Sequence, residues 1–212
     1  MRKWLKRYIA AVLVAILTVV CTNVTEVGAA SQTWKEAYKK ILNNWKLVEN
    51  YSNAGTDYLK QYFGKDYGFD RYFLEDVNGD KTPELFLSST SMGGLTVVFT
   101  YRDGKVVCLG CDLFYKINTS KKVLVVSGHW HGSGGSGSDE YSIYSIGKKE
   151  LKQKYYIDYL YDKYTVWNSN WEKAKNSKST YKKVYKKYVK GGKLFYKYKQ
   201  YKLLSKKGLN KF

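Results

Sequence analysis

Four oxygen-bearing side chains recur at short intervals in the stretch DVNGDKTPEL. Three of them, Asp76, Asn78 and Asp80, occupy every second position, and Glu84 follows four residues later. A hard cation such as Ca²⁺ takes roughly six to eight oxygen ligands. A chain that wraps around such an ion brings loop positions one, three and five together, and Thr82 at position seven offers its backbone carbonyl. The pattern therefore predicts a calcium site built from these five residues.

The spacing of this loop is not that of an EF-hand. An EF-hand loop requires glycine at position six and a bidentate acid at position twelve, and these positions hold Lys81 and Leu87. The flanking residues also have the composition of strands rather than helices. The alternative to a metal site is a polar turn whose side-chain oxygens accept hydrogen bonds from backbone N–H groups, and Lys81 inside the loop favours that alternative.

The pattern Asp-x-Asn-Gly-Asp-x-x-x-acid-Leu between two strands resembles the calcium loops of FG-GAP and VCBS-type β-hairpin repeats. The resemblance is limited to a single copy of the loop, so it does not imply a propeller. It implies that Asp76, Asn78, Asp80 and Glu84 supply side-chain ligands. The order of leader, aromatic helix, loop, strands and Lys/Tyr-rich tail also resembles uncharacterised secreted proteins of Gram-positive (Firmicutes) bacteria. That likeness supports export and calcium binding, but not catalysis.

A second set of possible ligands consists of Cys108 and Cys111 in CLGC, together with His129 and His131 in HWH. Two thiolates and two imidazoles have the ligand count of a closed Zn²⁺ site. No sequence rule brings the two pairs together, so a zinc site, a disulfide between the cysteines and a pair of inert thiols all stay open. Thioredoxin-like chemistry is disfavoured, because no helix begins at the first cysteine to lower its pKa.

The remaining polar residues form no recognisable catalytic set. The glycine-rich stretch at residues 132–138 lacks the Gly-Lys-Ser/Thr ending of a phosphate loop and the Gly-x-Ser-x-Gly pattern of many hydrolases. Asp139 and Glu140 follow without an evident acidic partner of the kind that a glycosidase needs. We therefore expect a non-catalytic protein, with a secreted hydrolase or a zinc-dependent enzyme as the alternative.

Residues 1–30 have the layout of a secretory signal peptide. A basic start is followed by an apolar stretch at residues 9–20 and by small residues, which predicts cleavage after Ala29 or Ala30. The apolar stretch is short for a membrane span, which needs about 20 residues. An uncleaved anchor and a lipoprotein attached through Cys21 are the alternatives, although the residue before Cys21 is not small.

The whole chain has a net charge of +19. Its positive charge is concentrated toward the C-terminal end. Residues 31–146 hold 13 basic and 13 acidic side chains, whereas residues 147–212 hold 20 lysines and 4 acids. In an exported protein this asymmetry favours an anionic cell-wall polymer, membrane surface or glycan as partner over nucleic acid. The alternative is a solubilising surface without a specific partner. The lysines expected to make the contact are Lys182, Lys183, Lys186, Lys187 and Lys190.

The elements that must position these residues begin with a helix. Thr33 and Glu36 fit a capping box. Apolar and aromatic residues then recur at helical spacing, which predicts an N-terminal helix with one apolar face. The residues of that face are Trp34, Tyr38, Ile41, Leu42, Trp45 and Val48.

Short stretches rich in Val, Ile, Phe and Tyr follow the loop region. Asp-Gly at residues 103–104 between two such stretches predicts a hairpin. Because no helical pattern separates the stretches, we expect an antiparallel meander sheet of about six strands. The predicted strands are residues 71–77, 84–89, 95–101, 105–109, 122–128 and 140–146.

The C-terminal part combines a basic helix with a closing strand. Tyrosine and valine recur at helical spacing between residues 181 and 189, and Gly191 and Gly192 end the pattern. Residues 193–204 then alternate as in a lysine-guarded edge strand. The sequence thus predicts an α+β fold in one extracellular domain, residues 31–212, with a strand-rich part at 66–146 and a Lys/Tyr-rich part at 147–212.

Overall fold

The structure is a computed structural model, and it describes residues 33–44, 68–91, 93–131, 137–175 and 177–202. Contacts divide the chain into residues 1–33 and Trp34–Phe212, and the account below concerns the second unit. The expected signal peptide, Trp45 and Val48 lie outside the described residues. Within the described part, none of the helices is long and apolar enough to cross a membrane.

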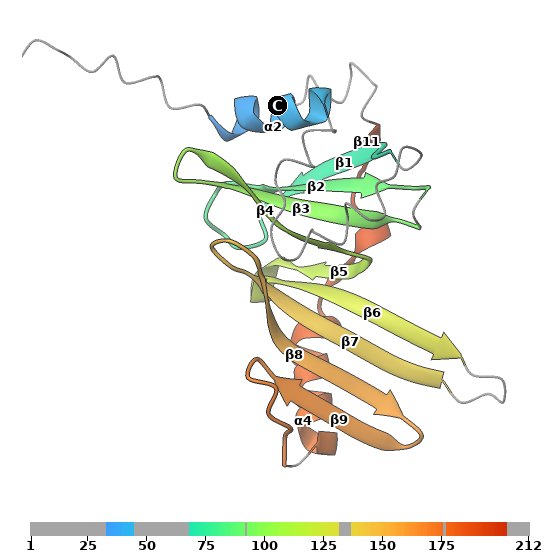
Figure 1. The fold of residues 1–212 in the computed structure, drawn as a ribbon. Coiled ribbons are helices and arrows are strands. Elements are labelled where there is room, and N and C mark those ends of the chain that lie inside the picture. Colours follow the sequence, from blue (N-terminus) through green and yellow to red (C-terminus); the bar gives the residue numbers. More distant parts are fainter. Residues whose placement is uncertain (1–32, 45–67, 92, 132–136, 176, 203–212) are drawn as a thin grey trace, which may run out of the picture. The chain divides into compact units, whose positions relative to one another are not determined.

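Two antiparallel sheets and a few helices make up the described residues, so the fold is α+β (Figure 1). The first sheet has the order β11-β1-β2-β3-β4, and the second has the order β10-β5-β6-β7-β8-β9. The strands of the first sheet are β1 (Arg71–Glu75), β2 (Glu84–Ser89), β3 (Leu95–Arg102), β4 (Lys105–Asp112) and β11 (Tyr201–Lys202). Those of the second are β5 (Phe114–Asn118), β6 (Val123–His131), β7 (Gly137–Ile146), β8 (Leu151–Leu160), β9 (Lys163–Asn168) and β10 (Lys193–Leu194).

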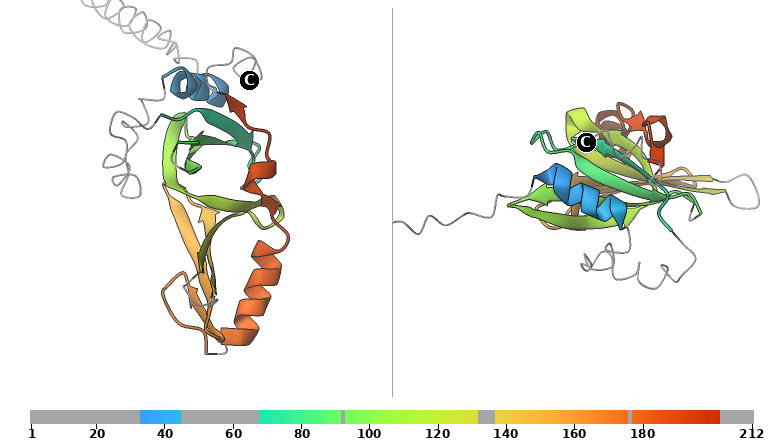
Figure 2. Two further views of the ribbon diagram at one scale, coloured as in Figure 1. Left: turned by 90° about the vertical axis from the view of Figure 1, so that its right-hand side faces the viewer. Right: turned by 90° about the horizontal axis from the view of Figure 1, so that it is seen from above.

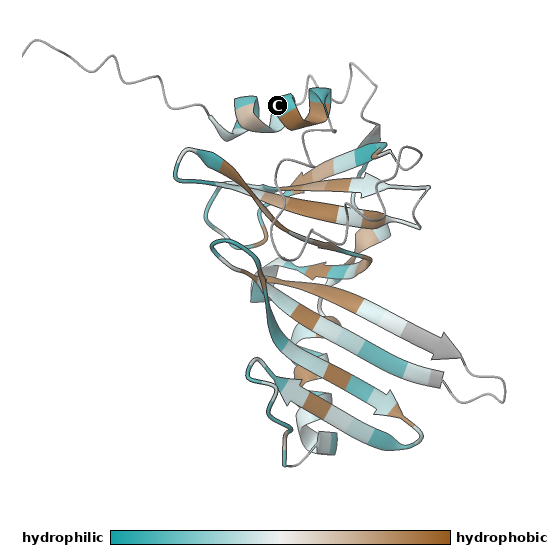
Figure 3. Ribbon diagram, viewed as in Figure 1, coloured by the Kyte–Doolittle hydropathy of each residue, from teal (hydrophilic) through white to brown (hydrophobic). Residues whose placement is uncertain are grey.

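The prediction of one six-stranded meander is wrong. All six predicted stretches are strands, but four of them form β1 to β4 of the first sheet and two form β6 and β7 of the second. The sequence does not predict β5, β8 or β9. Because β8 and β9 lie in the Lys/Tyr-rich part, the strand-rich region extends to Asn168. Figure 3 shows the reason: apolar residues run together in β2 and β3, whereas in β8 and β9 they are isolated among polar and weakly polar ones.

A hairpin and a bulge shape the edge of the first sheet. The predicted turn between β3 and β4 is present, and Asp103 and Gly104 have φ angles of 51° and 75°, as a type I′ turn requires. Farther along the pair the register shifts, so that Leu109 has no partner on β3. Gly110 follows with a φ of 143°. This bulge changes which side chains of β4 face the same way.

Three apolar clusters hold the two sheets and the helices together. In the first, Tyr38, Ile41 and Leu42 of α2 (Trp34–Asn43) pack on one face of the first sheet. The second cluster combines side chains from both sheets with Phe195 and Tyr198 of the C-terminal segment. The third places the C-terminal helix against the second sheet, and Figure 2 shows α4 running beside that sheet.

The C-terminal helix changes its winding halfway along. It begins as an α-helix, α4 (Ser177–Val184), and continues as a π-helix, η3 (Tyr185–Val189). Strand β5 holds its end, because Asn118 Nδ2 donates to the Tyr188 carbonyl over 2.9 Å. The predicted closing strand at residues 193–204 is instead two short pieces, β10 and β11, with the 3₁₀ turn η4 (Phe195–Lys197) between them. β10 pairs with β5 and β11 pairs with β1, so the segment joins both sheets.

Candidate cation loop and lysine surface

The loop with the calcium pattern connects β1 and β2, whose Glu75 and Glu84 are paired across the hairpin. Its backbone turns tightly, because Gly79 and Lys81 have positive φ angles of 74° and 71°. A left-handed conformation is costly for lysine and easy for glycine. The far end of the loop is anchored by α2, where Tyr38 Oη donates to the carbonyl of Pro83 over 3.0 Å. The hairpin and α2 therefore fix both ends of the loop.

The side chains of the predicted calcium ligands all turn into the loop. Asp76 accepts hydrogen bonds from the backbone N–H groups of Gly79 and Lys81, at 2.7 and 3.0 Å. Asp80 Oδ1 accepts from the backbone N–H of Thr82 over 2.8 Å. Asn78 is central, because its Nδ2 lies 2.9 Å from Asp80 Oδ2. These are the contacts of the polar turn that the sequence offers as an alternative to a metal site.

Glu84 is the only one of these acids that is fully buried, with 0% of its surface exposed. Its carboxylate accepts from the Val77 N–H over 2.9 Å and from Asn78 Nδ2 over 2.8 Å. Burial is the main reason that the pKa of Glu84 rises to about 7, and the negative charge of nearby Asp80 acts in the same direction. Hydrogen bonds from Val77 and Thr100 oppose that rise. Close to neutral pH, this group can gain or lose its proton.

Two cationic side chains lie beside the loop. Arg102 Nη2 is 3.7 Å from Asp80 Oδ2, and Arg102 Nη1 also donates to the carbonyl of Gly147 in the turn after β7. The ammonium of Lys122 covers Gly79, since a methyl group placed on that glycine would lie 3.1 Å from Nζ. Both positive charges reduce the attraction of the loop for a metal ion.

The types of oxygen atom in the loop suit calcium, but their positions in the structure do not surround a cation. Carboxylates, an amide and a backbone carbonyl are the oxygen ligands that Ca²⁺ takes. Across the described ranges, however, no group of three or more Asp, Glu, His or Cys side chains is arranged to hold a metal ion. The amide nitrogen of Asn78 lies between Asp80 and Glu84, where a cation would meet those carboxylates. Rotation of this amide by about 180° around the Cβ–Cγ bond would place Oδ1, rather than Nδ2, beside the two carboxylates. Calcium binding remains a prediction.

The two cysteines of the CLGC motif share one face of β4. Residues three apart on a regular strand point to opposite faces, but the bulge at Leu109 restores the same orientation. Cys108 is buried in the cluster beneath α2, and Cys111 packs against that cluster. They are thiols, without a disulfide between them. Burial raises the pKa of Cys108 to about 12, so this thiol is a poor nucleophile at neutral pH.

The structure does not bring the two halves of the possible zinc site together as strand neighbours. His129 and His131 lie at the end of β6, opposite Asp139 and Gly137 of β7. Strand β6 belongs to the second sheet, whereas the cysteines lie on β4 of the first. The described apolar side chains that pack with the cysteines come from α2, the first sheet and its flanks.

The five lysines predicted to contact an anionic surface are all exposed. The opposite face of the helix packs against the second sheet, with Tyr181, Val184 and Tyr188 buried and Tyr185 partly buried. Among the described residues, none of the five takes part in an ion pair. The ammonium of Lys187 lies 5.0 Å from the ring centre of Tyr188. One face of the helix therefore belongs to the core, and the other carries uncompensated positive charge. The five are Lys182, Lys183, Lys186, Lys187 and Lys190.

One pair of acids becomes visible only in the structure. Glu140 on β7 is directly opposite Asp158 on β8. Burial raises the pKa of Asp158, and the facing Glu140 raises it further. Tyr156 lies on the same strand, and burial followed by the charge of Glu140 raises its pKa to about 12. The sequence carries no signal for this pairing, because the register of β7 and β8 determines it.

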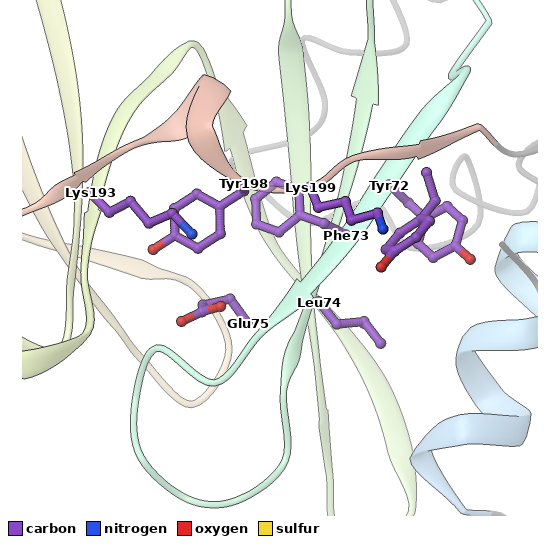
Figure 4. Close-up of a pocket in the computed structure, with 8 residues that line it drawn as sticks. Tyr72, Phe73, Leu74, Glu75, Lys193, Tyr198 and Lys199 are labelled. Carbon is purple, nitrogen blue, oxygen red and sulfur yellow. The ribbon is translucent and has the colours of Figure 1, made fainter. Parts of the chain in front are cut away.

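A pocket of about 330 Å³ lies between β1 and the C-terminal segment (Figure 4). Glu75, Lys193 and Tyr198 gather at one end, and Lys199 extends toward Tyr72 at the other. The ammonium of Lys193 is 3.9 Å from the ring centre of Tyr198, whose ring also stacks on Phe73. Because the ring of Tyr198 is already covered, the pocket presents charged and hydroxyl groups at its edge but no exposed face of that ring on which a ligand could stack.

The chain matches no family model, no curated protein and no solved structure.

Proposed function

We propose that the protein is a secreted, non-catalytic domain that contacts an anionic cell-wall polymer, membrane surface or glycan through the lysines of α4 and η3. The observation that supports this most strongly is the separation of the helix into a buried Tyr/Val face and an exposed lysine face. The signal-peptide layout of residues 1–30 supports an extracellular location. Calcium bound in the β1–β2 loop would stabilise the domain without taking part in a reaction.

Electrostatic attraction explains how such a helix would work. Its lysines project from a helix that is packed on a sheet, so their charges are held on one surface rather than spread over a flexible tail. Uncompensated charges on such a surface attract a polyanion, and salt screens them with a Debye length of about 8 Å at physiological ionic strength. The contact should therefore weaken steadily as salt is added.

Retention on isolated cell-wall material, measured over a series of salt concentrations, tests this role. The variant K182Q/K183Q/K186Q/K187Q should lose most of its retention. A matched variant, K39Q/K105Q/K121Q/K148Q, removes the same total charge from exposed lysines on other elements and should lose little. Equal losses in both variants would show that only net charge matters, and retention that ignores salt would exclude the electrostatic contact.

The calcium part of the proposal rests on the loop between β1 and β2. Asn78 links the side chains of Asp80 and Glu84, while Asp76 accepts from the backbone of the same turn, and the sequence pattern resembles FG-GAP and VCBS-type loops. Since Arg102 and Lys122 compete with the cation, we expect weak binding, on the order of 0.1–1 mM as in extracellular modules. Isothermal titration with Ca²⁺, with Mg²⁺ as control, measures it. No heat up to several millimolar Ca²⁺ would contradict the proposal.

A second candidate function is a secreted hydrolase, and the pairing of Glu140 with Asp158 favours it. Directly opposite residues have Cβ atoms about 4.5–5.5 Å apart, so side chains at these positions can bring their carboxyl groups to the separation of about 5–5.5 Å that retaining glycosidases use. The raised pKa of Asp158 suits a general acid. Release of reducing sugar from envelope glycans by the wild type, but not by E140Q or D158N, would establish this function. Zinc in the purified protein would favour a zinc enzyme instead.

A further inference from the structure

A groove at the start of α4 gathers four more lysines. It has a volume of about 720 Å³ and lies between β9 and the segment that leads into α4. That segment runs along the edge of the second sheet, because the Ala174 N–H donates to the Val166 carbonyl over 2.9 Å. In Figure 1, β9 and α4 lie next to each other at this end of the sheet. The charged residues that line the groove are Asp162, Lys163, Lys173, Lys175 and Lys178.

The charge of this groove is not neutralised by its surroundings. In the described part of the chain, none of its four lysines takes part in an ion pair. The carboxylate of Asp162 accepts a hydrogen bond from Tyr159 Oη over 2.6 Å. Glu172, the next acid along the chain, is bound by the side-chain amide of Asn168 over 2.8 Å and does not line the groove. Four lysines against one aspartate leave the groove with a net charge of +3.

We propose that this groove is a binding site for the phosphate groups of a linear phosphodiester polymer. The inference rests on the proposed function and gives its anionic partner a chemical class. Arginine pairs in a two-pronged way with carboxylates and phosphates alike, whereas lysine binds phosphate as a compact point charge that needs no planar partner. The groove contains lysine and no arginine. The first turn of α4 also holds no acidic residue, so the helix does not repel an anion there.

A polymer fits this surface better than a single ion. The groove continues into the exposed lysines of the helix, because Lys178, Lys182 and Lys186 follow one another at intervals of four residues. From Lys178 to Val184 the α-helix rises by roughly 9 Å, at about 1.5 Å per residue, and η3 continues the lysine face toward Lys190. The groove alone is many times larger than one phosphate group. A chain of repeated phosphates can occupy the groove and the lysine face together.

The groove is a poor site for single-stranded nucleic acid. Such ligands gain affinity by stacking their bases on open aromatic rings. The ring of Tyr164, the aromatic residue that lines the groove, already packs on Tyr159 at 4.6 Å and against Tyr181 at 5.1 Å between ring centres. The ammonium of Lys178 lies 5.7 Å from the centre of the same ring. Tyr161 and Trp171 are exposed nearby but do not line the groove. The groove itself therefore offers charge without stacking, which favours a polymer whose repeating unit has no base.

Isothermal titration with poly(glycerol phosphate) tests the proposal on the full mature chain. We compare wild type with the groove variant K163Q/K173Q/K175Q/K178Q, the helix variant K182Q/K183Q/K186Q/K187Q and the dispersed variant K39Q/K105Q/K121Q/K148Q. All three variants remove four charges from exposed positions, and circular dichroism checks their folding. We expect the groove variant to bind at least about tenfold more weakly than wild type and the dispersed variant less than about threefold, because screened distant charges matter little.

The comparison separates the two proposals. If the groove variant binds like the dispersed variant while the helix variant is weak, the groove site is excluded and the proposed function stands. If all three variants bind alike, both fail. Equally tight binding of polygalacturonate, which carries the same charge as carboxylate, or of an oligodeoxynucleotide would exclude selectivity for a phosphodiester polymer without bases. Binding of phosphatidylglycerol vesicles but not of the polymer would exclude the polymer as source of the phosphate.

Discussion

The side-chain amide of Asn78 donates a hydrogen bond to Glu84, with Nδ2 2.8 Å from Oε1. The same nitrogen bonds to Asp80 over 2.9 Å. A neutral N–H group thus holds two carboxylates together in the loop. Any change that replaces this donor with a further acid leaves the carboxylates to repel one another, unless a cation takes its place.

The substitution N78D should therefore make the fold depend on calcium. Without calcium, loss of the donor and added repulsion should lower the free energy of unfolding by roughly 1–3 kcal/mol. With calcium, the added charge should strengthen binding, because affinity follows the number of charged ligands. Thermal denaturation with and without millimolar Ca²⁺ measures both effects. N78A, which removes the donor without adding charge, is the control, and an equal response of both variants to calcium contradicts the loop as a metal site.

The stability of the protein should fall as pH rises through neutrality. The pKa of Glu84 rises from 4.5 to about 7 on folding, so the folded protein holds this proton more tightly than the unfolded chain. The stabilisation is complete below the unfolded pKa and is lost as pH rises through the folded pKa. The difference amounts to roughly 3 kcal/mol. Urea denaturation at about pH 5 and about pH 8 should show a smaller loss for E84Q than for wild type.

Calcium should oppose this loss, because it binds the ionised form of Glu84 and not the protonated form. Its affinity should rise over the same pH range in which the stability of the metal-free protein falls. If the free energy of unfolding has the same pH dependence with and without calcium, Glu84 is not a calcium ligand.

Arg102 should weaken calcium binding. Its guanidinium is 3.7 Å from Asp80, and both side chains are partly exposed. Removing one charge at this distance changes the interaction with a cation by about 1 kcal/mol, so R102Q should bind calcium severalfold more tightly in isothermal titration. R102K keeps the charge and loses the fork that also reaches the Gly147 carbonyl. Its calcium affinity should match that of wild type, and a gain in R102K would point to backbone rearrangement instead.

The two cysteines should differ in reactivity. Burial raises the pKa of Cys108 to about 12, while Cys111 is partly exposed. In the chain without residues 1–30, which contain Cys21, alkylation with iodoacetamide after reduction should give one adduct on the folded protein, at Cys111, and a second only in denaturant. Peptide mass spectrometry locates both. Labelling of Cys108 at the rate of Cys111 would show that β4 opens readily, and a protein that takes no adduct until it is reduced would contain the disulfide.

Local patterns in the sequence predict most of the individual elements, because each depends on neighbouring residues. Asp103-Gly104 sets its hairpin turn without help from the rest of the chain, and the Tyr/Val spacing of residues 181–189 marks the buried face of the helix. Strand β8 is missed because its tyrosines and lysines leave nine of its ten positions at least partly exposed. The alternation that marks a half-buried strand is therefore faint.

Local sequence patterns do not predict how elements far apart in the sequence pair or which of their side chains face each other. Nothing in CLGC shows that Leu109 bulges out and turns both cysteines to one face. The register that places Glu140 opposite Asp158 depends on the pairing of two whole strands. The β1–β2 loop is the opposite case, since its predicted ligands lie within nine residues and form hydrogen bonds inside one turn. Proximity in sequence is why its residues could be named and the acid pair could not.

The short strands β10 and β11 have a consequence for the order of folding. β10 closes one edge of the second sheet and β11 closes one edge of the first, and between them Phe195 enters the cluster that the sheets share. A ribosome that has not yet released residues 193–202 therefore presents both sheets with an open edge. Such long-range closure is slow. Until residues 193–202 pair, β1 and β5 expose unpaired backbone groups that can bind another chain.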